Sequence, residues 1–428
     1  MSRLTDSSRP VRWASLAVAC LLAAPLPLGV WAGMHLHFSP FLALQTFLSR
    51  APLSWFALPA VLVLLPVIRR ERWFCQNLCP TGALCDAVSA CRKRPRSWER
   101  FPPIHKTLLV AALAFAACGA PILAMLDPMA LFHAAWSPAH LGWTVAAVLS
   151  ATGLLLVLSI SLLWPRLWCL RLCPLGGLQA LAAELNRALQ RRSAAVAAEA
   201  AKPGLEINAI PAPGRPADCV AGKAFLGRRS LLVVIAGVTG GLILRRAAER
   251  RAPAVLRPPG ALSEDRFATT CCRCGNCMRA CPTRILKPAV DFEDPFGLLA
   301  PGVRFSPGHC LPSCNACGHA CPTGAIVAFE VEEKGRLFIG TAEIRLDECL
   351  LVQGRECNRC VASCGYRAVD VSGGLFESRP EIDASRCVGC GACEVACPTG
   401  AIRIRPFGPM VPEAGGKGHR PPVAGRQG

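Results

Sequence analysis

The sequence lacks the motifs of nucleotide-dependent and hydrolytic enzymes. It contains no Walker phosphate loop, no Rossmann glycine fingerprint and no plausible hydrolytic triad. It also contains no Cys-x-x-Cys-His, which argues against covalent attachment of a c-type haem. Tryptophan is absent after Trp168, and lysine and arginine are absent from residues 130–141. These absences argue against a nucleotide-dependent enzyme, a hydrolase and a c-type cytochrome, so the function must depend on other residues.

Cysteine is the residue type that stands out. The chain has 26 cysteines among 428 residues, far more than ordinary composition explains. A short secreted chain with many cysteines predicts a disulfide framework, but these cysteines cluster at metal-ligand spacings in a long chain. The length leaves room for two or three domains.

Charge and hydropathy predict an α-helical membrane domain over residues 1–183. Residues 1–250 hold 26 Lys and Arg against 10 Asp and Glu, and these basic residues form short blocks between long apolar runs. This pattern is typical of the cytoplasmic ends of membrane helices rather than of nucleic-acid binding. About four spans are expected, at residues 13–33, 53–68, 107–126 and 142–163.

The membrane domain contains an internal duplication. Ser39-Pro40 and Asp127-Pro128 each precede an apolar run, and each run ends in a related Cys-x-x-x-Cys-Pro motif. The first motif starts at Cys75 and the second at Cys169. Related halves place the two motifs together at the cytoplasmic face.

Three further segments complete the domain organisation. Residues 184–226 are rich in Ala, Pro and Arg and are expected to form a linker. Residues 227–250 begin with two arginines before an apolar run, which predicts either a twin-arginine-like export signal or a fifth anchor. Residues 251–406 are expected to form an α+β polyferredoxin domain, followed by a flexible tail at 407–428.

Four cysteine groups predict four 4Fe–4S clusters in residues 251–406. The first and fourth groups match the bacterial ferredoxin run C-x2-C-x2-C-x3-C-P, whose fourth Cys ligates the other cluster in two-cluster ferredoxins. Structural zinc sites instead use two Cys pairs separated by a longer spacer. The expected ligands are Cys271, Cys274, Cys277 and Cys281; Cys310, Cys314, Cys317 and Cys321; Cys349, Cys357, Cys360 and Cys364; and Cys387, Cys390, Cys393 and Cys397.

Local sequence also predicts secondary structure around these groups. Pro-Thr-Gly-Ala-Ile recurs after Cys321 and Cys397 and is expected to start strands of a small ferredoxin fold. Lys334-Gly335 lies between two β-prone triplets and is expected to be a hairpin turn.

The cysteines of the membrane domain allow several interpretations. Cys75, Cys79, Cys169 and Cys173 together can ligate one shared cluster, as the duplication indicates. Alternatively, Cys85 and Cys91 join the first loop and two clusters form, or all these residues are reduced structural thiols. His35, His37, His133 and His140 are candidates for contact with a quinone or haem, although solvated interfacial histidines are commoner.

Both halves resemble known families. The membrane half, with its Cys-x-x-x-Cys-Pro loops at 75–80 and 169–174, resembles the NapH/MauN-type membrane ferredoxins. The C-terminal half, with its twin-arginine-like segment and four cysteine groups, is similar to the NapG/MauM-type periplasmic ferredoxins. The resemblance implies a fusion of two partners that oxidises quinol and passes electrons to a periplasmic reductase such as the nitrate reductase.

The expected function is therefore electron transfer at the bacterial inner membrane, from quinol to a redox partner protein, with the ferredoxin half in the periplasm. One alternative is a non-catalytic maturation or redox-sensing protein. Another is an anchor that feeds a cytoplasmic enzyme. One difficulty follows from the expected topology: the two sets of clusters lie on opposite sides of about 30 Å of hydrocarbon.

Overall fold

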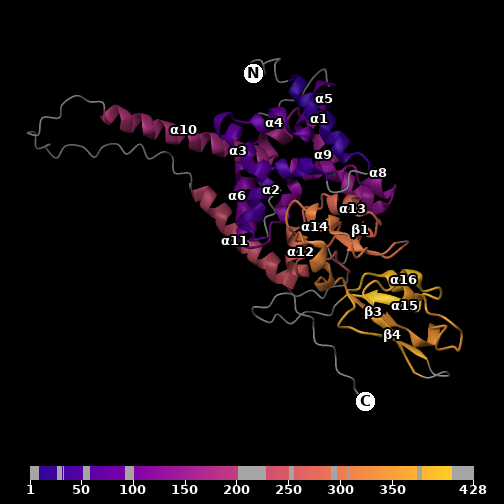
Figure 1. The fold of residues 1–428 in the computed structure, drawn as a ribbon. Coiled ribbons are helices and arrows are strands. Elements are labelled where there is room, and N and C mark those ends of the chain that lie inside the picture. Colours follow the sequence, from indigo (N-terminus) through magenta and orange to yellow (C-terminus); the bar gives the residue numbers. More distant parts are fainter. Residues whose placement is uncertain are drawn as a thin grey trace, which may run out of the picture.

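The computed structural model describes residues 9–26, 31, 33–51, 58–91, 101–200, 228–249, 255–290, 296–306, 308–373 and 378–406. Helices dominate up to residue 249, and the cysteine-rich C-terminal part lies against one end of this helical bundle (Figure 1). The predicted tail at 407–428 lies outside the described residues, as does the part of the predicted linker after residue 200. The first part of that linker is helical.

Apart from α8, the described helices of the bundle follow the same order in each half of the duplication. A short helical turn leads to a short helix with Pro at its first position, then to an apolar helix, a turn that carries the first Cys, and a helix that follows Cys-Pro. The first half comprises α1 (Arg9–Ala23), η3 (Met34–Phe38), α2 (Pro40–Leu48), α3 (Leu58–Arg69), α4 (Trp73–Asn77) and α5 (Pro80–Ala90); the second comprises α6 (His105–Ala117), η5 (Ile122–Leu126), α7 (Pro128–Ala134), α8 (Ser137–Leu141), α9 (Val145–Leu163), η6 (Trp168–Leu172) and α10 (Pro174–Ala200).

Backbone details repeat at equivalent positions. Arg72 and Arg166, each three residues before the first Cys of its motif, adopt φ of 64° and 59°. Positive φ is uncommon for a residue other than glycine, so its recurrence is a conformational mark of the duplication. The halves also interlock, since α5 packs on α9 of the other half and α10 packs on α3.

Each expected span contains a helix in its described part, and these helices differ in length. The four helices have 15, 12, 13 and 19 residues, and α1 ends before Pro25. Of the described helices, two are long and apolar enough to cross a membrane: α9, and the stretch Leu231–Ala248 within α11 (Arg228–Glu249). An α-helix rises 1.5 Å per residue, so α9 extends over about 28 Å.

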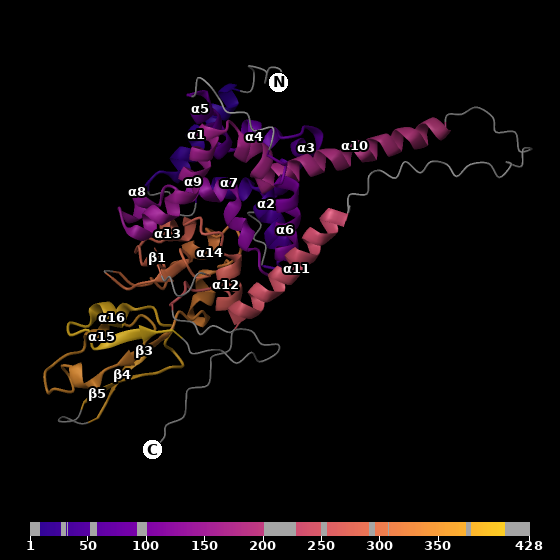
Figure 2. The ribbon, with the colours of Figure 1, turned by 180° about the vertical axis from the view of Figure 1, so that it is seen from behind.

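The helix α11 runs parallel to α6 and carries the chain along the bundle. Cβ atoms built on Gly237 and Gly241 would lie 2.8 Å from Ala114 and 2.9 Å from the Cβ of Cys118, so only glycine permits this approach. Small residues four apart are typical of closely packed membrane helices. The start of α6, at His105, lies against Gly177 near the second Cys-Pro motif. Because α11 then meets α12 (Glu264–Thr270), the Cys-Pro loops and the C-terminal part occupy opposite ends of the bundle (Figure 2).

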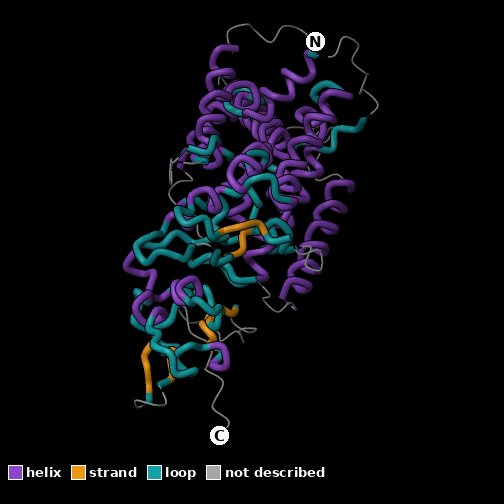
Figure 3. The backbone as a smooth tube through the Cα atoms, turned by 90° about the vertical axis from the view of Figure 1, so that its right-hand side faces the viewer, coloured by secondary structure: helices purple, strands orange, loops and turns teal. Residues whose placement is uncertain are grey.

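In its described residues, the C-terminal part consists of short helices and three two-stranded antiparallel sheets, connected by long loops (Figure 3). The sheets pair β1 with β2, β3 with β6 and β4 with β5. Because β3 pairs with β6, the tail of the fourth cysteine group returns to the segment that precedes the third. The elements are α13 (Asn276–Ala280), β1 (Leu286–Pro288), β2 (Pro301–Val303), α14 (Ala316–His319), η7 (Val331–Arg336), β3 (Thr341–Ile344), η8 (Leu346–Glu348), α15 (Arg359–Ser363), β4 (Val369–Ser372), β5 (Arg379–Ile382), α16 (Ala392–Ala396) and β6 (Ile402–Arg405).

The hairpin expected at Lys334-Gly335 is wrong. These residues lie in the 3-10 helix η7. Glu330 and Glu333 form a reciprocal capping box at its start, which satisfies the free backbone N–H groups there. This local capping favours a helical turn over the β pairing that the flanking triplets predict.

Candidate iron–sulfur sites

Glycines allow the cysteine loops of the C-terminal part to wrap tightly. Gly275 and Gly391 precede α13 and α16 with φ of 77° and 81°, in the left-handed region that favours glycine. Gly389, with φ of 69°, leaves no space for a side chain, since a Cβ there would lie 2.3 Å from the carbonyl oxygen of Gly340. The equivalent loops of the first and fourth groups thus share one backbone shape.

The cysteines gather in fours, and each set of four crosses between two groups. Three pockets are lined by the first three cysteines of one group together with the last cysteine of another. A fourth set is defined by neighbouring thiols: burial raises the pKa of Cys277, and Cys271, Cys274 and Cys321 raise it further. We name the sets site A (Cys271, Cys274, Cys277, Cys321), site B (Cys281, Cys310, Cys314, Cys317), site C (Cys349, Cys357, Cys360, Cys397) and site D (Cys364, Cys387, Cys390, Cys393).

The spatial order of the sites differs from their order in the sequence. Sites A, B and D contribute to one buried core around Phe267 and Ile326. The backbone N–H of Cys310 in site B donates to the carbonyl of Cys390 in site D over 2.9 Å. Site C belongs to a separate, smaller core with part of site D. The order from the bundle outward is therefore A, B, D, C.

The chemistry of these sites fits iron–sulfur clusters. Burial raises the pKa of Cys317 in site B to about 12, and the neighbouring thiols of Cys310, Cys314 and Cys281 raise it too. Four crowded, buried thiols are poor thiolates unless a metal centre supplies compensating positive charge. Within the described ranges, no three His, Cys, Asp or Glu side chains converge closely enough for a single metal ion. The thiols of sites B, C and D instead line pockets.

Lys334 provides a further indication at site B. Its side chain is buried at 3% exposure and lines the same pocket as the four thiols. The ammonium donates to the carbonyl oxygens of Leu311 and Cys314, and no carboxylate partner is present among the described residues. A buried ammonium requires negative charge nearby, and a thiolate-ligated cluster supplies it. Sequence reasoning missed Lys334 because it assigned this residue to a turn.

The four cysteines of the bundle motifs also come together. Cys75 lies in α4 and Cys169 in η6, while Cys79 caps α5 and accepts a hydrogen bond from the Gly82 N–H over 3.3 Å. Burial raises the pKa of Cys79, and the thiols of Cys75 and Cys173 raise it further. The two motifs thus meet across the duplication, as the sequence predicts.

The glycine of each motif has a matching role. Cβ atoms built on Gly82 and Gly176 would lie 3.1 Å and 3.0 Å from the carbonyl oxygens of Cys75 and Cys169. Contacts this short are tighter than a side chain normally makes, so glycine allows each Cys-Pro helix to approach its own cysteine turn. We name the resulting set of Cys75, Cys79, Cys169 and Cys173 the bundle site.

Two residues at equivalent positions exchange contacts between the halves. Gln179 of the second half donates from Nε2 to the Cys75 sulfur over 2.9 Å, and its Oε1 accepts from the Phe74 N–H over 3.1 Å. Cys85, its counterpart in the first half, lies beside the thiol of Cys169, which lowers the pKa of Cys85. Cys91 is exposed and bonds to Ala87 of its own helix. Gln179 and Cys85 occupy equivalent positions in the repeat, and this equivalence is the sequence signal from which both contacts could have been predicted.

The histidines gather at the opposite end of the bundle. His35 and His133 are buried, with ring centroids 5.1 Å apart. Arg279, from the first cysteine group, contacts the His133 ring over 2.9 Å. Burial lowers the pKa of His35 to about 3, and the positive charge of Arg279 lowers it further. These residues join the bundle to the C-terminal part.

Comparison with known proteins shows which family the chain is related to. A 4Fe-4S binding domain family (Fer4) matches residues 380–403, and a second one (Fer4_5) matches twice, at 51–98 and 146–192. The methylamine utilization ferredoxin-type protein MauM of Methylobacillus flagellatus is 36% identical over 42% of this chain and 80% of its own length. The chain belongs to the MauM/NapG ferredoxin-type family.

Other members give the same result. MauM of Methylorubrum extorquens is 36% identical over 46% of this chain and 96% of its own length. The ferredoxin-type protein NapG of Escherichia coli is 30% identical over 42% of this chain and 86% of its own length. No solved structure matches the chain. As a ferredoxin-type protein with 4Fe–4S domains, this chain is an iron–sulfur electron-transfer protein. The match to each of these relatives covers less than half of the chain.

Proposed function

We propose that this ferredoxin-type protein carries electrons from membrane quinol to a soluble redox partner, through one shared cluster in the bundle site and four clusters in sites A to D. Bound 4Fe–4S clusters take up and release single electrons. The observation that carries the proposal is the crossed arrangement of four cysteines at each of sites A to D. The chain supplies ligands, spacing and a buried environment.

Packing supports a connection between the bundle site and site A. Cys79 and Cys173 belong to the same buried cluster of residues as Met129, Cys272 and Cys274. The helix α7 spans this region over about 10 Å. At its start lies Asp127, whose carboxylate adds to the pKa rise that burial causes in Cys173. Near its end, His133 contacts Arg279. A short buried helix thus lies between the bundle site and site A.

Surface apolarity supports a membrane location. Many large apolar side chains on the helices are exposed, as lipid-facing side chains are. They include Leu58, Val61, Leu62 and Leu65 of α3; Val148, Leu155, Leu156, Leu162 and Leu163 of α9; and Leu231, Leu232, Ile235, Leu242 and Ile243 of α11. We propose a multi-pass protein of the bacterial inner membrane, related in its bundle to NapH/MauN-type proteins.

The position of the C-terminal part supports a periplasmic location for it. By the positive-inside rule, the basic loops favour a cytoplasmic location for the Cys-Pro motifs. Arg12 of α1 pairs with Asp86 at that end, whereas the carbonyls of Leu22 and Ala24 at the other end of α1 accept from Arg279. The sites A to D lie at this second end, where a periplasmic reductase or cytochrome can reach them.

Anaerobic EPR of the detergent-extracted protein tests the function. Reduced 4Fe–4S signals are expected when a quinol analogue is the only reductant. Signals that develop with dithionite but never with quinol would overturn quinol oxidation, and they would favour a maturation or redox-sensing role.

A further inference from the structure

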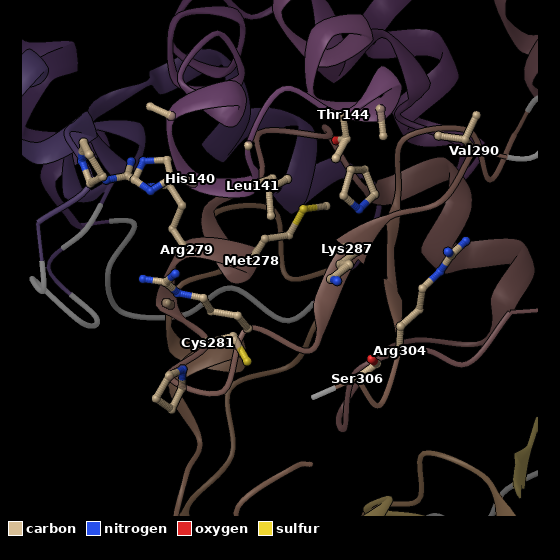
Figure 4. Close-up of a pocket in the computed structure, with 18 of the residues that line it drawn as sticks. His140, Leu141, Thr144, Met278, Arg279, Cys281, Lys287, Val290, Arg304 and Ser306 are labelled. Atoms are coloured by element: carbon tan, nitrogen blue, oxygen red, sulfur yellow. The ribbon is translucent and has the colours of Figure 1, made fainter. Parts of the chain in front are cut away.

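A large cavity lies between the bundle and the C-terminal part, at the junction where the two parts meet (Figure 4). Its volume is about 1060 Å³, at the upper end for sites that hold small molecules. Residues of α8 and the start of α9 form one wall, and residues around α13, β1 and β2 form the other. The charged and imidazole side chains of the lining are His140, Arg279, Arg284, Lys287 and Arg304.

The charged side chains that line the cavity in the described part of the chain are all basic. No Asp or Glu lines the cavity within the described ranges. The side chains of Arg284, Lys287 and Arg304 are exposed, and in the described part of the chain they have no ion pair or hydrogen bond. Arg279 reaches His133 and two carbonyls, but its Nε is buried and finds no partner there. Clustered cations with unused donors are suited to an anion with several oxygens, such as a phosphate.

The other wall is largely apolar, apart from His140 and Thr144, and it includes the beginning of a membrane-type helix. Leu26, Leu141 and Val145 line the cavity. Trp143 lies two residues before Val145 in the sequence. Its side chain is 88% exposed, and that of Val145 is 68% exposed. Tryptophan is enriched where membrane helices meet the headgroup layer, and an exposed apolar helix surface there contacts acyl chains. The cavity therefore combines a cationic wall with an apolar wall at the expected membrane surface.

We propose that this cavity binds the phosphate headgroup of an anionic phospholipid, with its acyl chains along the first turns of α9. The proposal rests on the proposed membrane location. A lipid held by Arg284, Lys287 and Arg304 on one side and by α9 on the other would connect the C-terminal part to the bundle and fix its orientation on the membrane. Arg279 and His133 already bridge the same junction directly.

The test measures lipid retention by the full-length protein in nanodiscs that contain equal amounts of phosphatidylglycerol and phosphatidylcholine. Native mass spectrometry after release into detergent counts the lipids that remain bound. A triple variant, Arg284→Gln with Lys287→Gln and Arg304→Gln, removes the unpartnered cations. The matched control, Arg336→Gln with Arg355→Gln and Arg403→Gln, removes the same charge at exposed positions outside the cavity.

The native protein is expected to retain phosphatidylglycerol preferentially. Each cation near an anionic membrane contributes about a factor of five in affinity, so the triple variant should lose roughly 100-fold of this preference. The control should keep it. Visible absorption of the iron–sulfur clusters serves as the check that both variants fold.

Three results would overturn the assignment. Equal retention of the two lipids would show that the cavity does not select anionic headgroups. Equal losses in both variants would show that only net charge matters. Displacement of the lipid by millimolar inorganic phosphate would show a free-anion site. A protein that stays out of membranes altogether would instead contradict the proposed membrane location, whereas failed quinol reduction would leave this lipid site standing.

Discussion

The Ser39 hydroxyl donates a hydrogen bond to Asp127, with 2.6 Å between Oγ and Oδ2. Both residues are buried, and both are the N-cap of equivalent helices, α2 and α7. The other carboxylate oxygen of Asp127 accepts from the Met129 and Ala130 N–H groups over 2.8 Å and 3.2 Å. The duplicated halves are therefore joined through the same position of the repeat, close to the bundle site.

Replacing Asp127 with Ala should destabilise the bundle. The change removes the cap of α7 and leaves the Ser39 hydroxyl group without an acceptor for its hydrogen, a loss of about 1–3 kcal/mol. Thermal unfolding in detergent should show a lower midpoint than that of the native protein. Asp86→Ala is the comparison at an ion pair that is partly exposed. A midpoint unaffected by Asp127→Ala would show that the Ser39–Asp127 contact does not join the halves.

The same carboxyl predicts a pH dependence of stability. Burial raises the pKa of Asp127 to about 6, although hydrogen bonds from Ser39 and two N–H groups oppose the rise. Since the folded-state pKa lies above the unfolded value, its contribution is fully present below about pH 4 and is lost as the pH rises through 6. When the pH is lowered from 7 to 5, the free energy of unfolding of the native protein should therefore increase relative to that of Asp127→Asn. A difference that is constant over this range would contradict the prediction.

The crossed pairing of cysteines predicts how many clusters each double variant loses. Cys281→Ser with Cys310→Ser alters two cysteine groups but only site B, so one cluster should be lost. Cys281→Ser with Cys271→Ser alters one group but two sites, so two clusters should be lost. Iron analysis with Mössbauer spectroscopy counts the clusters. If the pair from one group loses only one cluster, each group binds its own cluster.

Lys334→Gln should lower the reduction potential at site B. The buried ammonium stabilises the more negative, reduced form of a nearby cluster, and an amide does not carry that charge. Redox titration followed by EPR should show one of the four C-terminal signals shifted downward by tens of millivolts. Arg336→Gln, an exposed cation of the same short helix, is the control. Equal shifts in both variants would remove the special role of Lys334.

Gln179→Leu should lower the potential at the bundle site. Gln179 donates to the Cys75 sulfur, and hydrogen bonds to ligand sulfurs raise cluster potentials. The expected change is a downward shift of one EPR signal, without a change in those of sites A to D. Asn186→Ala, in the same helix but bonded to the carbonyl of Ile68, provides the control. Without any shift, Cys75 would not be a ligand.

Features that depend on neighbouring residues could be predicted from the sequence. The cysteine spacings indicate the ligands because short gaps and glycines such as Gly275 and Gly391 determine the shape of each loop locally. The repeated Cys-Pro motifs predicted that Cys75, Cys79, Cys169 and Cys173 lie together, because equivalent segments of a duplication adopt equivalent structures. The length of the apolar run extended the first expected span to residue 33, whereas the helix α1 ends at Ala23, before Pro25.

The tertiary structure decided what depends on distant segments. The order A, B, D, C arises because β6 pairs with β3, which places the fourth cysteine group between the second and third. Burial of Lys334 and the contact between Gln179 and Cys75 join residues far apart in the chain. Sequence spacing determines loop shape through short-range geometry, whereas partner choice between loops depends on how the whole core packs.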